Sequence, residues 1–497
     1  MHTLLGWFAL TLASGAAEPA VAAKPASHAS GYSYSSLSAV PVEDSPEHAV
    51  KSAPAETIFI HAEHVITRPG RVIDDASVLV RNGKVIAVGK DLTKPDGARE
   101  IEGKYVCAGF IDPWAAIGLG FDALGEPGAT PATRSKDGYD PFNFDHLRKD
   151  ALRAGVTSAR LQTGNTSRIG GLGALVRIRP GAARDDVILN ADCNLWMTIG
   201  LSQGGQMSFD SQGEISFGSR AVDPFERIES VDRLVSQLQA GKNYLVQKNE
   251  YKHDLEAWQK TITEKEIELD KEFKKAKKDR EKAEKDATEK GKKFEEKKYK
   301  EDKKPTAPRI DEDSEVLARV ANGEIPMIVF VNRVAEIRAL LQATEGLERL
   351  RLIIAGGSEA PYFAKQLAER RIPVLIWPAP MGRNRPDEFD GSDLSLAARL
   401  SHEGVTVLLG SGGLDPAASR DLPLLAGLAI GNGLDREKAL EALTLGAARA
   451  LDVADRLGSV ESGKDADLIV LDGEPLVSTS HVRWVIAGGQ VVVTPED

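Results

Sequence analysis

Cysteine is scarce in this sequence, which has two cysteines, Cys107 and Cys193, among 497 residues. So few cysteines exclude a fold that is held together by a framework of disulfide bonds. Both cysteines lie in apolar runs, so we expect buried, unreactive thiols rather than a redox pair.

Three other features are missing, and each absence argues against a class of protein. After residue 23 no run approaches the ~18 uninterrupted apolar residues of a membrane helix, so we expect no transmembrane segment in the mature chain. No glycine-rich nucleotide-binding loop follows any strand-like run. Basic residues are not in excess, since 74 acidic residues outnumber 63 basic ones. The resulting net charge of -11 argues against nucleic acid as a partner.

The first 54 residues differ in composition from the rest of the chain. Residues 1–23 contain an apolar run of signal-peptide length followed by small residues, with only His2 where a basic residue is usual. We interpret them as a signal peptide, which predicts export to the periplasm or to the outside of the cell. Residues 24–54 are rich in alanine, serine and proline without periodicity, and we interpret them as a disordered linker.

Short strands are predicted at both ends of the remaining chain. Near the beginning, two β-branched runs flank Asn82-Gly83, a dipeptide that favours a tight hairpin turn because both residues tolerate positive φ. Near the end, the stretches ADLIVLDGEPL and HVRWVIAGGQVVV follow one another, with Gly488-Gly489 at a second turn. We therefore predict one small composite β-sandwich, formed by residues 55–106 and 456–497.

The middle of the chain, residues 107–455, alternates apolar strand-like runs with amphipathic helical ones. Examples of the strand-like runs are GVTSARLQ, PMIVFVNR, RLRLIIAGG and GVTVLLGSGG, and RVAEIRALLQATEGL is one of the helical ones. Strands that are apolar on both faces and alternate with helices indicate a parallel sheet of the α/β class. At this length we predict a closed (β/α)8 TIM barrel rather than an open doubly wound sheet.

A charged segment, residues 248–304, interrupts this alternation. It contains 20 basic and 17 acidic residues, and no proline occurs before Pro305. Tyr251, Leu255, Trp258 and Ile262 follow one another at helical spacing, which predicts a helix with one apolar stripe. Two interpretations remain open: a solvated helical arm with ion pairs along its surface, or a coiled-coil arm that binds a partner.

Several of these stretches resemble the amidohydrolase superfamily, in particular its imidazolonepropionase-like bacterial members. The stretch ALEALTLGAARALDVADRLGSVESGKDADLIVLDGEPL is similar to the closing signature of the family, and ASVLVRNGKVIAVG and VCAGFIDPW are similar to its opening. The likeness covers residues 55–495 apart from the charged segment. It implies a (β/α)8 barrel with a β-sandwich built from both chain ends, and hydrolysis of non-peptide carbon–nitrogen bonds such as those of cyclic amides.

The resemblance also implies a metal site, and here the sequence departs from the family. Such hydrolases activate water on one or two divalent ions, zinc or another metal, held by His-x-His on the first barrel strand, histidines on the fifth and sixth, and an aspartate on the eighth. The corresponding positions of this chain hold Trp114, Ala116, Phe330, Gly356 and Gly412. None of these side chains binds a divalent cation. We therefore expect no metal, no cofactor and no catalytic residue at these positions.

Neither histidine nor serine offers a replacement site. Of the nine histidines, His146 and His402 fall in the predicted barrel, each in a helical run ahead of a strand, and we expect both on a helix surface. Ser202 fits a G-x-S-x-G pattern, but a glycine-broken stretch follows it in place of the helix that a nucleophile elbow requires. We interpret this match as chance.

Other polar and aromatic side chains remain near the predicted strand ends, where barrel enzymes bind their ligands. These candidate binding residues are Asp112, Arg160, Gln162, Asn332, Arg333, Glu359, Trp377, Ser411 and Asp415. The acidic ones could act as general acids or bases without a metal, but local roles are favoured. Asp112 belongs to the family's opening stretch, Glu359 falls in the first turn of a helix expected near Ser358, and Asp415 precedes a proline at a turn or helix start. The set either orients a small ligand over an apolar floor of Trp114 and Phe330, or the aromatic rings plug the barrel mouth.

Two functions from different classes follow. One is an active amidohydrolase that uses an atypical site. The other is a degenerate homologue that keeps the fold and acts as a binding or assembly subunit, with an active amidohydrolase paralogue or a small molecule as its partner. The altered ligand positions favour the second function, and an oligomer is compatible with either.

Overall fold

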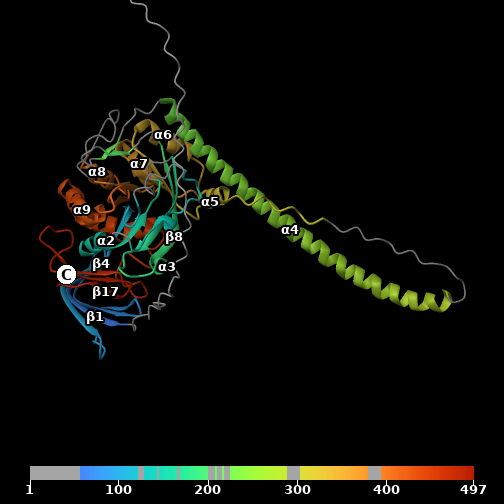
Figure 1. Ribbon diagram of the computed structural model, residues 1–497, viewed down its shortest axis with the longest axis horizontal. Coiled ribbons are helices and arrows are strands. Elements are labelled where there is room, and N and C mark those ends of the chain that lie inside the picture. Colours follow the sequence, from blue (N-terminus) through green and yellow to red (C-terminus); the bar gives the residue numbers. More distant parts are fainter. Residues whose placement is uncertain are drawn as a thin grey trace, which may run out of the picture. The chain divides into compact units, whose positions relative to one another are not determined.

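The computed structural model describes residues 56–120, 128–142, 145–164, 168–199, 207–209, 215–217, 224–287, 303–378 and 393–496 (Figure 1). The predicted signal peptide and linker, and the G-x-S-x-G serine Ser202, lie outside these residues.

Eight strands form the barrel sheet, in the order β14-β13-β12-β11-β8-β7-β6-β5. Their bounds are β5 (Phe110–Ala115), β6 (Val156–Leu161), β7 (Ile169–Arg177), β8 (Ile188–Thr198), β11 (Met327–Val331), β12 (Leu352–Gly356), β13 (Val374–Ile376) and β14 (Val407–Leu409). The predicted barrel is confirmed, with two departures. The sheet is nearly closed, since no strand pairing is found between β14 and β5 in the described chain. In addition, β7 runs antiparallel to both β6 and β8. In the described chain no helix longer than the four-residue α3 (Arg184–Val187) separates β6, β7 and β8, so β7 joins its neighbours as in hairpins.

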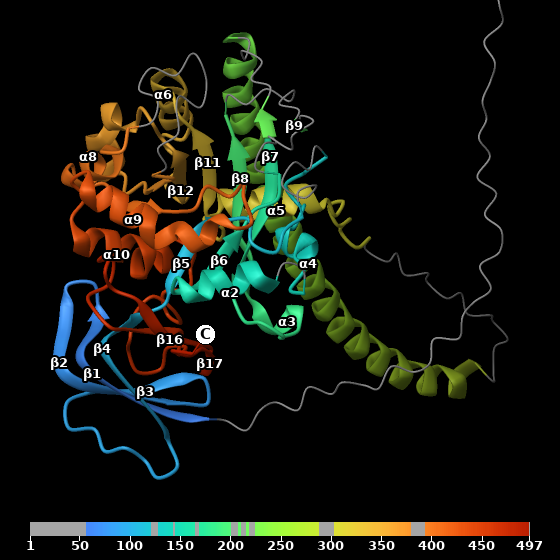
Figure 2. The ribbon, with the colours of Figure 1, turned by 60° about the vertical axis from the view of Figure 1, so that its left-hand side comes forward.

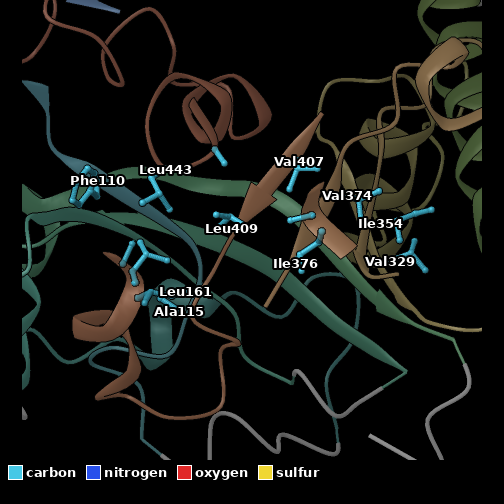
Figure 3. Packing of buried hydrophobic residues seen from close by; sticks show 14 of the residues in the cluster. Phe110, Ala115, Leu161, Val329, Ile354, Val374, Ile376, Val407, Leu409 and Leu443 are labelled. Atoms are coloured by element: carbon cyan, nitrogen blue, oxygen red, sulfur yellow. The ribbon is translucent and has the colours of Figure 1, made fainter. Parts of the chain in front are cut away.

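The barrel strands alternate between an outer face that packs on helices and an inner face that fills the barrel. In β11, Met327, Val329 and Val331 belong to the outer core, whereas Ile328 belongs to a separate inner cluster. The same alternation continues in β12, β13 and β14, where the inner residues are Ile353, Ala355, Leu375 and Leu408. Figure 3 shows the outer residues of these strands as sticks, among them Val329 and Ile354. Successive side chains of a strand point to opposite faces, so these runs are apolar throughout because both faces are buried.

Helices cover the outer face of the barrel (Figure 2). They are α2 (Asp145–Arg153), α5 (Glu312–Ala321), α6 (Val334–Ala343), α7 (Ala364–Glu369), α8 (Leu396–His402), α9 (Leu422–Gly431), α10 (Arg436–Leu443) and α11 (Leu445–Ala450), with the short turns η1 (Ser135–Gly138), η2 (Ala360–Phe363) and η3 (Ala418–Asp421). Two of them begin at aspartates whose side chains cap the helix: Asp311 accepts from the Ser314 N–H, and Asp435 accepts from the Lys438 N–H.

A second sheet joins both ends of the described chain, as predicted. Its order is β17-β16-β15-β4-β1-β2-β3. The strands are β1 (Thr57–Arg68), β2 (Arg71–Arg81), β3 (Lys84–Gly89), β4 (Arg99–Ala108), β15 (Leu468–Leu471), β16 (Val482–Ala487) and β17 (Gln490–Val493). Asn82 and Gly83 have φ of 53° and 75° at the β2–β3 turn, so the predicted hairpin is confirmed. All seven strands are continuous in one sheet, because β15 pairs directly with β4.

Buried ion pairs connect this sheet to the barrel. The Arg177 guanidinium at the end of β7 donates to Asp467 at 2.8 and 2.7 Å and to Asp465 at 2.7 Å. Burial favours the neutral form of Arg177, but the two carboxylates outweigh it and raise the pKa of the guanidinium. Lys84 and Arg456 also donate to Asp465, so one carboxylate holds cations from both ends of the chain and from the barrel.

The longest helix, α4 (Pro224–Ala287), contains the beginning of the charged segment. It starts ahead of that segment, and Val231, Leu234 and Leu238 in its first turns are buried in the outer core. Further along, Gly241 lies against the backbone of Leu317 in α5, where an added Cβ would stand 2.5 Å from the Leu317 carbonyl. The charged composition from residue 248 onwards therefore marks where the packed part of this helix ends. It does not mark where the helix begins, which is at Pro224. None of the helices in the described part of the chain is both long and apolar enough to cross a bilayer.

Candidate functional site

Three aromatic rings from different strands meet inside the barrel. The ring centroids of Trp114 in β5 and Trp196 in β8 are 5.4 Å apart, and Phe330 in β11 lies 5.8 Å from Trp114 and 6.4 Å from Trp196. Trp114 and Trp196 are buried, and Phe330 is half-buried. Edge-to-face and offset contacts of this kind stabilise aromatic pairs. The predicted apolar floor is thus present, and it includes a tryptophan, Trp196, that the sequence analysis did not select.

The glycines at the strand ends are packed against these and neighbouring side chains. A Cβ on Gly412 would stand 2.5 Å from the Trp377 indole, and a Cβ on Gly356 would collide with the Asn332 side chain and lie 3.0 Å from the Phe330 ring. Both glycines also have positive φ, 95° for Gly412 and 83° for Gly356, which strains any other residue. Backbone conformation and packing together leave no room for a longer side chain at either position.

Asp112 joins the two edges of the barrel sheet. Its Oδ1 accepts hydrogen bonds from the backbone N–H groups of Trp114 at 3.0 Å and Ser411 at 3.1 Å, and its Oδ2 accepts from the Ser419 hydroxyl at 2.8 Å. The Ser411 hydroxyl in turn donates to the Trp114 carbonyl. The carboxylate therefore links β5 to the loop after β14 and to η3. This agrees with the structural role expected for Asp112, and it also places Ser411 in the same network.

Arg160 and Gln162 form a second buried network on the inner face of β6. Arg160 Nη1 donates to the side-chain oxygens of Gln162 at 2.9 Å and of Asn194 in β8 at 3.1 Å, and its Nε donates to the Pro113 carbonyl at 2.5 Å. The guanidinium also lies over the Trp196 ring, 5.2 Å from its centroid. Burial lowers the pKa of Arg160 to about 10, so the group is still a cation at neutral pH.

Asn332 and Glu359 form a third group, at the ends of β11 and β12. The Asn332 side-chain oxygen accepts from the hydroxyl of Ser358 at 3.0 Å. The backbone carbonyl of Asn332 accepts from the Glu359 N–H at 3.0 Å. The Glu359 carboxylate accepts from the N–H of Val334, the first residue of α6. The prediction that Glu359 lies in the first turn of a helix near Ser358 was wrong. Glu359 precedes η2, and its side chain caps the neighbouring helix α6. Arg333 stands at the N-cap position of α6 and is half-buried.

The remaining candidates lie apart from these networks. Asp415 is exposed, and its carboxylate accepts from the Ala417 N–H at 2.8 Å, which is the turn that its neighbouring proline predicted. Trp377 is half-buried against Gly412.

Comparisons with known proteins agree with this architecture. The sequence model of the Amidohydrolase family matches residues 335–494. An imidazolonepropionase from Porphyromonas gingivalis is 36% identical over 112 residues, which are 21% of this chain and 26% of that protein. A second imidazolonepropionase, from Syntrophobacter fumaroxidans, is 41% identical over 68 residues, or 13% of this chain and 16% of that protein. The matched segments thus span about a quarter or less of these relatives' length.

Solved structures extend the likeness over nearly the whole chain. The crystal structure of an amidohydrolase from Thermotoga maritima superposes with a TM-score of 0.64 and 25% identity, and covers 88% of this chain and all of that one. The chain belongs to the amidohydrolase superfamily. A molinate hydrolase structure, with a TM-score of 0.50, 15% identity and coverage of 88% of this chain and 95% of that one, shows the shared fold alone.

In the described ranges, the side chains at the positions that the family resemblance assigns to metal ligands do not bind divalent metals. Within the described ranges, no group of three or more His, Cys, Asp or Glu side chains lies close enough to hold an ion. The segments outside those ranges between residues 56 and 496 contain neither histidine nor cysteine. His146 and His402 are exposed on α2 and α8, as expected for helix surfaces. Where the family resemblance places imidazole and carboxylate ligands, this chain has indole, methyl and phenyl side chains and glycine.

Sequence reasoning did not select Asn194, Trp196 or Ser419. Asn194, Trp196 and Thr198 alternate along β8, so a period of two within the run NLWMT was a signal that all three face the barrel interior. Ser419 had no comparable signal, because its bond to Asp112 joins residues that lie 307 positions apart.

Proposed function

We propose that this amidohydrolase-superfamily chain is a degenerate homologue that binds a small molecule or a partner protein and does not hydrolyse through a metal centre. The observation that carries the proposal is the packing at the former ligand positions. Trp114 and Phe330 line the barrel interior, and Trp377 covers Gly412, where the family resemblance places an aspartate. Indole and phenyl rings supply no lone pair for a divalent cation.

Hydrolysis without a metal would need another way to activate water, for example a free carboxylate as general base. Asp112 is poorly suited to that task, because three hydrogen-bond donors already occupy its two oxygens. The Glu359 carboxylate caps α6, and Asp415 is exposed in a turn. Each carboxylate among the candidate residues thus has a structural partner that accounts for its position.

Family membership favours one alternative, an active amidohydrolase with an atypical site. The relatives named imidazolonepropionase match the chain over short segments, and the Thermotoga maritima amidohydrolase over its whole length. When bound in such hydrolases, a divalent metal lowers the pKa of water and polarises the carbonyl of the substrate. The alternative therefore requires donors that the described barrel interior does not offer.

A partner protein is the second form that the binding proposal can take. An active paralogue is one such partner, and the charged part of α4 is a surface on which it could dock. Tyr251, Leu255, Trp258 and Ile262 are half-buried on that helix, whereas the positions between them are exposed. The net charge of -11 makes nucleic acid an unsuitable partner.

Thermal unfolding with and without metal tests the proposal. The purified full chain is compared with an active imidazolonepropionase, each after addition of EDTA and after addition of zinc, manganese or nickel. We expect the Tm of this chain to be unchanged by chelator and by low stoichiometric amounts of metal, and we expect no turnover of cyclic amides or dipeptides. The control enzyme should lose stability and activity with chelator. Chelator-sensitive turnover by this chain would establish the active alternative.

A further inference from the structure

Arg160 is a fully buried cation with an unused donor. Its Nε and Nη1 groups donate to Pro113, Gln162 and Asn194, but Nη2 has no hydrogen-bond partner. Among the described residues no carboxylate forms an ion pair with it. The neighbouring Asp112 acts on it only at longer range, because the Asp112 oxygens accept from other groups. Leaving a buried charged donor unsatisfied costs the full desolvation of that group, so such a group indicates a missing acceptor.

Two more polar atoms, one on β5 and one on β6, are buried without partners. One is the indole Nε1–H of Trp114, the residue that follows Pro113, whose carbonyl accepts from Arg160. The other is the hydroxyl of Ser158, which shares the inner face of β6 with Arg160 because the two are two positions apart along the strand. Three unused donors thus come from the neighbouring strands β5 and β6.

Aromatic side chains pack against Arg160 and Trp114. The Trp196 ring lies under the Arg160 guanidinium, and Trp114 and Phe330 complete the aromatic group. Ile328, Ile353 and Leu408 belong to the same inner cluster. One cation and two neutral donors, with aromatic rings against the cation, are groups that suit a ligand with a single negative charge and a planar apolar body.

We propose that the barrel interior binds the carboxylate of a small organic acid through Arg160, Trp114 and Ser158. The guanidinium supplies the charge and one unused pair of N–H donors, and the indole and hydroxyl supply neutral donors. The rings of Trp196 and Phe330 pack on the apolar part of the acid. This inference rests on the proposed function, since a metal centre would occupy the same end of the barrel.

Binding of matched acids and amides tests the proposal. The probes are formate, acetate and benzoate, each paired with its amide, added to the full chain while tryptophan fluorescence and Tm are recorded at constant ionic strength. We expect benzoate to raise the Tm and quench the fluorescence, and benzamide to do neither at the same concentration. Arg160→Gln should weaken benzoate at least tenfold, while Arg153→Gln, an exposed control on α2, should not change it. Equal effects of acids and amides, or no effect of any acid at 50 mM, would overturn the proposal.

A second variant covers the case in which Arg160→Gln does not fold. Trp114→Phe keeps a ring but removes the indole N–H, and we expect about tenfold weaker benzoate binding, as for one lost hydrogen bond. In the unmodified chain, the ¹⁵N resonance of the Arg160 guanidinium should shift on addition of benzoate. If that resonance and the affinity of Trp114→Phe are both unchanged, the buried donors bind water and the proposal is wrong. Metal content is measured on the same samples: stoichiometric metal overturns the proposed function, whereas metal-free protein without acid binding overturns this inference alone.

Discussion

At the scale of single residues, Asp112 shows how a buried carboxylate can serve the fold. Its three donors come from β5, from the loop after β14 and from η3, so one side chain connects the first and last strands of the barrel. The opening stretch of the sequence indicated a local role. The long-range partners could not be predicted, because Ser411 and Ser419 are about 300 positions away along the chain.

Replacing Asp112 should therefore destabilise the barrel. In Asp112→Asn the amide oxygen can still accept from the two backbone N–H groups, but the NH2 group then faces the Ser419 hydroxyl, which loses its charged acceptor, and we expect a loss of about 1–3 kcal/mol. Asp415→Asn is the matched control, since Asp415 is exposed and its loss should change stability by about 0.5 kcal/mol or less. Urea unfolding of both variants gives the comparison. Equal stability of the two would contradict the role assigned to Asp112.

The two thiols should be unreactive in the folded protein. Cys107 and Cys193 are both buried; burial raises the pKa of both, that of Cys193 to about 12. Since the thiolate is the reactive form, neither cysteine should react with Ellman's reagent at pH 8 in the native state. Two equivalents should react after unfolding in guanidinium chloride. Rapid reaction of either thiol in native protein would show that the apolar runs around them are not packed as described.

At the scale of elements, the interface between the barrel and the second sheet depends on charge. Burial of Asp465 opposes its ionisation, but hydrogen bonds from Lys84, Arg177 and Arg456 outweigh this and lower its pKa. A carboxyl whose folded-state pKa is lowered contributes stability above its unfolded value of about 4, and this contribution is lost as pH falls through the folded value.

Acid unfolding should report this contribution. We expect the Tm of the unmodified chain to fall steeply below about pH 4 and that of Asp465→Asn to start lower and to fall less steeply. The control is Asp91→Asn, because Asp91 is an exposed aspartate that follows β3 of the second sheet. Parallel curves for the unmodified chain and Asp465→Asn would mean that the Arg177 network does not stabilise the contact between the sheets.

The helix α4 should divide into a part that stabilises the fold and a part that does not. Leu234 and Leu238 are buried in the outer core, so Leu238→Ala should cost about 2–5 kcal/mol. Replacement of residues 250–304 by a short Gly/Ser linker should leave the Tm nearly unchanged, because this stretch is mostly charged. Differential scanning calorimetry measures both. A large loss on replacement would mean that the stripe from Tyr251 to Ile262 packs on the rest of the protein.

At the scale of the whole molecule, the alternation of apolar runs was sufficient to predict the barrel and the second sheet. Asn82-Gly83 fixed one hairpin, because its turn depends on two adjacent residues, and the apolar strands indicated burial on both faces. The direction of β7 could not be predicted, since IGGLGALVR reads equally well in either direction within a sheet. The Arg160–Gln162–Asn194 network was also missed as a unit, because it depends on which strands become neighbours.

The central claim is the proposal that this chain keeps the barrel of the superfamily and binds no metal. The most direct measurement is the metal content of the full chain, purified without chelator and incubated with zinc, then dialysed and analysed by inductively coupled plasma mass spectrometry. An active imidazolonepropionase treated in the same way is the positive control. We predict well below 0.1 equivalent of any divalent transition metal in this chain and about one equivalent in the control. One or two equivalents retained by this chain would contradict the account.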